Sequence, residues 1–372
     1  MRAAAKSAAM LELSYREIQS VSLDRLCTVD YKVSTFSYVK VHKMKRISLR
    51  SFVIFAILSL GFSPGGLLAA DPVKVRVAYI NNIQSAVLAH IKTLAKEQNL
   101  DIELIPFTRY PDVQKALAVN SVDLGPIAPN GIPAAVAQGD RNVVAVMDLV
   151  YGGDAVIVRK GVNVQKFSDL KGKRIGVAEG GIAWIMFVML LEKNGMSYAD
   201  IQPANFSSAT DMLNALKRSD TDAVNLWEPF VTEALAEGYA YMPRGVDFRD
   251  TALGAMNGIL GASKAFANKQ PDALVGAIRL VLKAEQQLEK DRKLWISIVR
   301  GYSKLNDDIL QRSLAGIRYA GPHLSRTKLD ATATFLFKAG IAKNDVTGKL
   351  GDTVDPRFLA RAAGKSEAEV LQ

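Results

Sequence analysis

Four short segments carry side chains that are suited to holding a small molecule. Amide and carboxylate groups form hydrogen bonds, and tryptophan can stack on a ring or cover an alkyl chain. Glycine and proline beside them allow tight turns and helix starts. This chemistry is recognition of a solute rather than the making or breaking of bonds. The segments are Asn81–Gln84 (NNIQ), Ile127–Gly131 (IAPNG), Glu179–Trp184 (EGGIAW) and Leu226–Phe230 (LWEPF).

Groups able to carry nucleophilic or metal chemistry are scarce in the 372 residues. Cys27 is the single cysteine, and beyond residue 70 only His90 and His323 supply imidazole rings. A glycine-rich phosphate loop of the Walker type is missing from the sequence. We therefore predict no metal site, no cofactor and no enzyme activity, and we expect both histidines to be surface or partly buried residues.

Residues of the four segments also have purely structural interpretations. A glycine pair can form a turn, proline can open a helix and asparagine can cap one, tryptophan can fill a core, and glutamate can lie at a helix start. These alternatives concern Gly180, Gly181, Pro129, Asn130, Trp227 and Glu228. Asn130 and Glu228–Pro229 fall at equivalent points of an internal repeat, and this coincidence favours binding.

Alternating strand and helix patterns position the four segments. Their order predicts an α/β fold, in which ligands bind beyond the carboxyl ends of the strands, beside helix N-termini. Strand patterns cover 74–80, 102–105, 123–128, 143–149, 154–159, 174–178, 202–206 and 222–226. Helical patterns cover 87–95, 110–119, a stretch opening near Pro129, 182–193, 208–218, 229–237 and 272–290.

Two series of these elements look like copies of one unit. Asp123 matches Asp222 and Gly139 matches Gly238, both at an offset of 99 residues, and Ala116-Leu117 matches Ala215-Leu216. Further upstream, Val77-Ala78 matches Val177-Ala178 at an offset of 100. Two copies are too few for a solenoid, so we predict two similar lobes with a cleft between them.

The lobe boundaries follow from where the two series meet. We predict that residues 71–153 and 256–372 form lobe 1 and that residues 154–255 form lobe 2. Two glycine-bearing segments join them, Tyr151-Gly152-Gly153 and the Met256–Ala262 run that holds Asn257-Gly258. Glycine permits the backbone rotation that a hinge requires, so both are hinge candidates.

The N-terminal region accounts for much of the net charge of +10. Residues 1–70 hold 10 Lys and Arg against 4 Asp and Glu, which leaves 37 against 33 in the remainder. That mixed remainder predicts no nucleic-acid partner. A basic start, the apolar run Phe52–Phe62 and small residues up to Ala70 predict a cleaved signal peptide over 44–70. Residues 1–43 are then an extension from a misassigned start.

Several stretches resemble the sulfonate-, taurine- and nitrate-type solute-binding proteins of ABC importers, which have the two-lobed type II periplasmic binding fold. The likeness spans about Val73 to Leu359. Its carriers are VRVAYI (75–80), ALAVNSVDLGPIAPNGIPAAVAQG (116–139), FSDLKGKRIGV (167–177) and DAVNLWEPF (222–230). The resemblance implies a monomeric periplasmic protein that is not lipid-anchored. It would capture a small-molecule solute and deliver it to an inner-membrane ABC permease by hinge closure.

One segment departs from the family pattern. Sulfonate binders tend to be serine-rich where this chain has Glu179–Trp184, which contains no hydroxyl group. Glu179 would repel an anion, whereas backbone N–H groups, Arg109 and Tyr110 could hold one. A sulfonate, taurine, nitrate or organic acid is the first choice of solute, and a thiamine-pyrimidine-type heteroaromatic is the alternative. A ligand-sensing subunit of a signalling system is a further alternative, and it differs only in its partner.

The resemblance and the loop positions together give one set of predicted ligand-binding residues. Amide, aromatic and charged side chains dominate it, with glycine and proline at the turns. The set is Asn81, Asn82, Gln84, Arg109, Tyr110, Pro129, Asn130, Tyr151, Glu179, Gly180, Gly181, Trp184, Trp227, Glu228 and Asn257.

Overall fold

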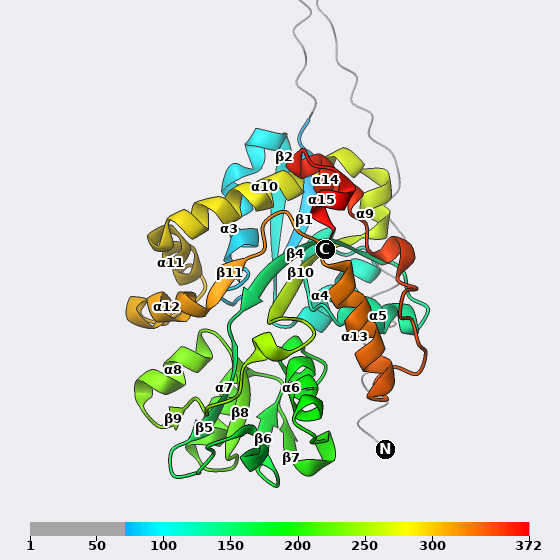
Figure 1. Ribbon diagram of the computed structural model, residues 1–372. Helices are drawn as coiled ribbons and strands as arrows, with labels where there is room; N and C mark the ends of the chain where they lie inside the picture. Colours follow the sequence, from blue (N-terminus) through cyan, green and yellow to red (C-terminus); the bar gives the residue numbers. More distant parts are fainter. Residues whose placement is uncertain (1–70, 372) are drawn as a thin grey trace, which may run out of the picture. The chain divides into compact units, whose positions relative to one another are not determined.

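The structure is a computed structural model that describes residues 71–371, and the expected signal peptide and N-terminal extension lie outside this part of the chain. Strands of the described residues form two sheets (Figure 1). The six-stranded sheet has the order β11(Ile317–Tyr319)-β4(Val143–Gly152)-β10(Met256–Ser263)-β3(Leu124–Ile127)-β1(Val73–Ile80)-β2(Leu100–Phe107). The five-stranded sheet has the order β7(Gln202–Asn205)-β6(Arg174–Val177)-β8(Ala223–Trp227)-β5(Asp154–Arg159)-β9(Ala240–Tyr241).

Both sheets mix parallel and antiparallel strands. β1 is parallel to β2 and β3, and β6 is parallel to β7 and β8. β10 runs antiparallel between β3 and β4, and β5 runs antiparallel to β8. The predicted α/β class is confirmed. The run that holds Asn257-Gly258 is a buried strand, β10, of the six-stranded sheet, and its role as a hinge stays a prediction.

Helices cover the faces of both sheets. α6, α7 and α8 pack on the five-stranded sheet, while α3, α4 and α10 pack on the six-stranded sheet, and α13 packs against α5 (Figure 1). The helices are α3 (Ala86–Leu94), α4 (Tyr110–Ala118), α5 (Gly131–Ala137), α6 (Ile182–Lys193), α7 (Ala209–Lys217), α8 (Phe230–Glu237), α9 (Lys264–Lys269), α10 (Pro271–Lys290), α11 (Arg292–Arg300), α12 (Asp307–Ser313), α13 (Arg326–Lys338), α14 (Arg357–Ala363) and α15 (Glu367–Val370). Among residues 71–371, none of the helices has the length and apolar character needed to span a membrane.

An arginine–aspartate pair recurs at the same place in each sheet. Arg76 of β1 donates from its guanidinium to both carboxylate oxygens of Asp123, and its backbone N–H donates to the same side chain. Arg174 of β6 makes the same set of bonds to Asp222. The pairs tie the first strand of each unit to the start of the third, so they support the internal repeat. The strand register makes Ile175, not Val177, the equivalent of Val77, which corrects the predicted offset there by two residues.

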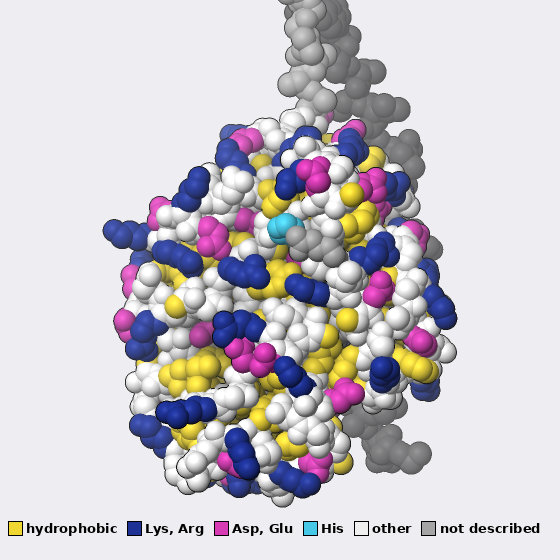
Figure 2. Space-filling model, in the orientation of Figure 1, with side chains coloured by type: hydrophobic (Ala, Val, Ile, Leu, Met, Phe, Trp, Pro, Cys, Tyr) yellow, Lys and Arg dark blue, Asp and Glu magenta, His cyan; other side chains and the backbone are white. Residues whose placement is uncertain are grey.

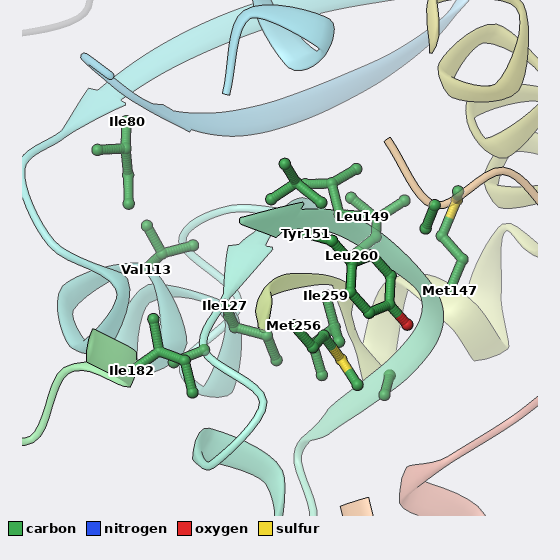
Figure 3. Packing of buried hydrophobic residues seen from close by; sticks show 14 of the residues in the cluster. Ile80, Val113, Ile127, Met147, Leu149, Tyr151, Ile182, Met256, Ile259 and Leu260 are labelled. Carbon is green, nitrogen blue, oxygen red and sulfur yellow. The ribbon is translucent and has the colours of Figure 1, made fainter. Parts of the chain in front are cut away.

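Apolar side chains from both sheets meet in one hydrophobic cluster. Ile80 of β1, Val113 of α4 and Ile182 of α6 belong to this cluster (Figure 3). Ile182 comes from the helix that covers the five-stranded sheet, so apolar burial extends across the junction between the two sheets. Charged groups are mixed on the outer face, where Lys and Arg alternate with Asp and Glu (Figure 2).

Candidate functional site

A cavity of about 370 Å³ lies between the two sheets. The strand ends and following loops of both sheets line it, as expected for a ligand site in an α/β fold. Eight of the predicted residues line this cavity: Asn82, Gln84, Arg109, Tyr110, Glu179, Gly181, Trp227 and Asn257. Lining residues that the sequence reasoning did not select include Ile80, Thr108, Asp154, Asn205, Phe206 and Ser207. We refer to this space as the central cavity.

The structure places the other predicted residues elsewhere. Asn130 and Gly180 line a neighbouring cavity of about 280 Å³. Tyr151 and Glu228 line a third cavity of about 750 Å³. Asn81, Pro129 and Trp184 do not appear among the residues that line these three cavities. Their assignment as ligand-binding residues stays a prediction.

Trp184 and Glu228 have protein partners instead. The Trp184 ring packs edge-on against Tyr198, with ring centroids 5.8 Å apart. The Glu228 carboxylate accepts hydrogen bonds from the backbone N–H and hydroxyl of Thr232 in α8. Burial raises the pKa of Glu228, and these Thr232 bonds act in the opposite direction. The contact with α8 fits the alternative interpretation of Glu228 as a charge at a helix start.

A chain of three polar side chains crosses the junction beside the central cavity. The Tyr110 hydroxyl donates to Asn257 Oδ1 at 2.8 Å. Asn257 Nδ2 in turn donates to Asp154 Oδ2 at 2.6 Å. Tyr110 and Asn257 come from elements of the six-stranded sheet, and Asp154 begins β5 of the other sheet. The chain therefore connects the two sheets at the bottom of the cavity and fixes the orientation of the Asn257 amide.

Asp154 is the most perturbed acid in the central cavity. Burial raises the pKa of its carboxyl group to about 7, the Asn257 hydrogen bond opposes this shift, and the nearby Glu228 adds to it. Among the described residues, Asp154 Oδ1 has no hydrogen-bond partner. A buried carboxylate oxygen without a partner is unfavourable and can accept a donor from a ligand.

The second carboxylate of the cavity is already hydrogen-bonded. Glu179 Oε1 accepts the Tyr198 hydroxyl at 2.7 Å, and Oε2 accepts Asn205 Nδ2 at 3.4 Å. Asn205 Oδ1 also accepts the Glu179 backbone N–H at 3.1 Å. The neighbouring side chains thus hold Glu179 in place. Each of its two carboxylate oxygens accepts a hydrogen bond, whereas Asp154 Oδ1 accepts none.

The cationic group of the cavity is also partnered. Arg109 Nε and Nη2 donate to the two carboxylate oxygens of Asp112 at 3.1 and 3.2 Å. Its side chain is half exposed, at the rim rather than at the bottom. The lining of the cavity therefore contains two carboxylates and one guanidinium that is engaged in an ion pair.

Aromatic residues behind the cavity hold the loop that carries Asn82 and Gln84. Trp295 is fully buried, stacks on Tyr319 and donates its indole N–H to the Ile83 carbonyl at 3.0 Å. The Tyr302 hydroxyl donates to the Asn82 carbonyl at 3.0 Å. Both bonds fix backbone carbonyls of the loop, and thereby the positions of its side chains.

We expect Trp295→Phe to lower the free energy of unfolding by about 1 kcal/mol, because the Ile83 carbonyl loses its donor while most of the ring packing remains. Chemical denaturation measures this loss. Tyr302→Phe is a second test, because it removes the hydroxyl group that donates to the Asn82 carbonyl of the same loop, and we expect a similar loss of stability. An unchanged stability of both variants would contradict the assigned role of these bonds.

The site residues that the sequence reasoning missed follow strand ends that it had located. Thr108 follows β2, and the Asn205–Ser207 stretch ends and follows β7. The rule that ligands gather at the carboxyl ends of parallel strands, applied to every strand, would have found them. Asp154 gives no such signal, because it begins a strand.

The described residues contain no group of three or more His, Cys, Asp or Glu side chains that could hold a metal ion. His90 is buried, and its Nε2 lies 2.7 Å from Gln287 Oε1. Thr93 lies against the other ring nitrogen at 3.2 Å. These contacts give His90 a structural role, but its burial corrects the expectation of a surface or partly buried residue.

A known protein family matches more than half of the chain. The profile described as NMT1/THI5 like matches residues 81–291, which is more than half of the chain. The chain belongs to the NMT1/THI5-like family. This match includes the loops that form most of the central cavity.

Individual relatives of this NMT1/THI5-like chain are named as binding proteins. A putative binding protein of Brucella abortus is 32% identical over 191 residues, 50% of this chain and 57% of that protein. The alignment thus spans little more than half the length of that relative.

Two crystal structures share the fold. The alkanesulfonate-binding protein from Xanthomonas axonopodis pv. citri, bound to MOPS, is 23% identical with a TM-score of 0.66, covering 77% of this chain and all of the other. The periplasmic aliphatic sulphonate binding protein of Escherichia coli is 19% identical with a TM-score of 0.64, covering 75% and 91%. The type II periplasmic binding fold predicted from the sequence is therefore confirmed.

Proposed function

We propose that the chain is a periplasmic solute-binding protein that captures one small organic solute in the central cavity and delivers it to an ABC import permease. The observation that carries this proposal is a cavity of about 370 Å³ whose lining comes from both sheets. A solute that contacts both sheets favours the closed arrangement over an open one and shifts the population between them. The proposal assigns no catalytic step to the cavity.

Direct contacts across the junction support closure around the solute. Asn257 of β10 donates to Asp154 of β5, and Asn130 before α5 donates from Nδ2 to the Gly180 carbonyl at 3.3 Å. Helix α12 also packs against α8. In this proposal the two lobes move about residues 152–154 and 255–257, which the Asn257–Asp154 bond holds together. The Asn130–Gly180 contact and the packing of α12 against α8 break on opening and form again on closing.

The cavity lining fits more than one class of solute. The names of the two structural relatives support a sulfonate. The helix N-terminus at Gly181–Ala183, which lines the cavity, supports an anionic group in general and therefore also taurine, nitrate or an organic acid. Phe206, Trp227 and Tyr110 also line it and provide ring surfaces, which favours the alternative of a heteroaromatic solute.

Ligand titration of the protein with residues 71–372 tests the proposal. A thermal-shift panel of sulfonates, nitrate, aromatic acids and pyrimidines should contain a stabilising solute, worth about 2.7 kcal/mol at roughly 100 times its dissociation constant. Small-angle scattering with that solute should show a smaller radius of gyration. A panel without any stabilising solute, or unchanged dimensions at saturation, would count against solute capture by closure.

A further inference from the structure

The bottom of the central cavity contains hydrogen-bonding atoms that the protein leaves unused. Gln84 is 1% exposed, lines the cavity, and has no partner among the described residues for either Oε1 or Nε2. Asp154 Oδ1 is likewise buried and without a partner. Burying such groups without hydrogen bonds is unfavourable, because they lose their contacts with water and gain none from the protein. A bound solute that supplies the missing partners would offset that cost.

Both side chains line the central cavity, and the Gln84 amide lies beside the backbone that leads into Asp154. Gln84 Nε2 is only 2.6 Å from the position that a Cβ atom on Gly153 would occupy, and Gly153 directly precedes Asp154. Gly153 thus leaves room for the Gln84 amide at this strand start. The Tyr110–Asn257 chain uses Asp154 Oδ2 and leaves Oδ1 free, so the carboxylate is held in position by one oxygen and available through the other.

The charges around this pair disfavour an oxyanion at the same place. Glu228 is close enough to Asp154 to repel negative charge there. Glu179 is the other carboxylate of the lining, and the guanidinium of Arg109 is paired with Asp112. A negative group next to Asp154 would meet like charge, and the described residues that line the cavity offer no unpaired cation to balance it, whereas a positively charged or N–H-bearing group would be attracted.

We propose that Asp154 and Gln84 recognise a hydrogen-bond-donating nitrogen of the solute, such as a primary ammonium or an amino group on an aromatic ring. Asp154 Oδ1 accepts from this nitrogen, and the Gln84 amide bonds to the atoms beside it. The inference rests on the proposed solute-binding function and narrows its ligand class. Solutes without such a nitrogen, including nitrate and simple alkanesulfonates, are then poor ligands.

Two matched pairs of probe molecules measure how much the amino nitrogen contributes to binding. Taurine and ethanesulfonate differ only in the amino group, and so do 4-aminopyrimidine and pyrimidine. We expect the amino member of a pair to bind at least about tenfold more tightly at pH 8, in line with a charge-assisted hydrogen bond. Isothermal titration calorimetry measures both affinities.

Asp154→Asn should reduce the preference within a pair to less than about threefold, and Gln84→Met should weaken binding of the amino member through the second contact. Asp272→Asn is the matched control, because it makes the same chemical change at an exposed carboxylate of α10 that does not line the cavity, and it should leave the preference within a pair unchanged. Circular dichroism verifies that each variant folds. The Gln84 variant keeps the test valid if Asp154→Asn does not fold.

Equal affinities within both pairs, a preference that persists in Asp154→Asn, or no binding of any of the four probes would overturn the inference. Tight binding of ethanesulfonate or of another solute without the nitrogen would overturn it while leaving the proposed function intact. Failure of the proposed function itself would appear differently, as a broad panel in which no solute stabilises the protein.

Discussion

Replacing Gly152 with alanine should lower the free energy of unfolding by about 3 kcal/mol. Gly152 has a φ of +82°, and an alanine Cβ would lie 2.0 Å from the carbonyl oxygen of Gly316. The left-handed backbone costs an alanine roughly 1–2 kcal/mol, and relieving the overlap with a backbone atom costs roughly 1–3 kcal/mol more. Urea denaturation of the wild type and the variant gives the difference directly.

Gly139→Ala provides the control for backbone conformation alone. Gly139 has nearly the same φ, +83°, but no atom lies within 4 Å of its added Cβ. We expect its cost to stay near the roughly 1–2 kcal/mol of the left-handed conformation. Equal losses at both positions would show that the close approach of Gly316 contributes nothing.

The position of Gly152 links this stability effect to solute binding. Its backbone N–H donates to the Ala255 carbonyl at 2.8 Å, so the two segments that connect the sheets are hydrogen-bonded to each other. Gly153 follows with a φ of +89° and faces the Gln84 amide. A shift of this strand end would therefore move the side chains at the bottom of the cavity as well.

Hydrophobic periodicity was enough to locate the elements that build the site. The pattern at 154–159 coincides with β5, and the pattern at 182–193 coincides with α6. The strand expected over 143–149 continues to Gly152, because its last residues are still paired with β10 and β11. The end of a strand depends on its neighbours in the sheet, which a single segment of sequence does not reveal.

The position of a residue in the sequence does not show whether its side chain points into the central cavity. Asn130 and the Glu228–Pro229 pair fall at equivalent points of the repeat, yet none of these residues lines the central cavity. The Glu228 carboxylate turns to Thr232 and the Asn130 amide turns to Gly180. Asp154 was not selected because its segment looked like an ordinary strand. Its place in the cavity depends on pairing with Trp227 across β5 and β8.

Between about pH 5 and 7, the free energy of unfolding of the solute-free wild type should fall relative to that of Asp154→Asn. Burial raises the pKa of Asp154 in the folded protein from 3.8 to about 7. In this range the folded state holds a proton that the unfolded state has released, so stability decreases as pH rises, by about 1.4 kcal/mol per unit. Between pH 5 and 7 the change is on the order of 3 kcal/mol, and it levels off above pH 7.

Comparison with the variant is essential, because Glu228 and Glu285 also have pKa values raised by burial and contribute slopes of the same sign. Asparagine keeps the shape of the side chain and cannot titrate, so the difference between the two curves isolates Asp154. Urea denaturation at half-unit pH steps provides both curves. Parallel curves from pH 5 to 8 would contradict a raised pKa at this position.

Solute binding should reverse the sign of this pH dependence. A taurine ammonium beside Asp154 favours the ionised carboxylate, so binding below pH 7 releases the proton that folding had retained. Taurine affinity should therefore increase with pH up to about 7 and then become constant, whereas Asp154→Asn should show no such increase. The unfavourable ionisation of Asp154 in the empty cavity thus becomes the source of its selectivity, because only a donor group on the solute compensates for it.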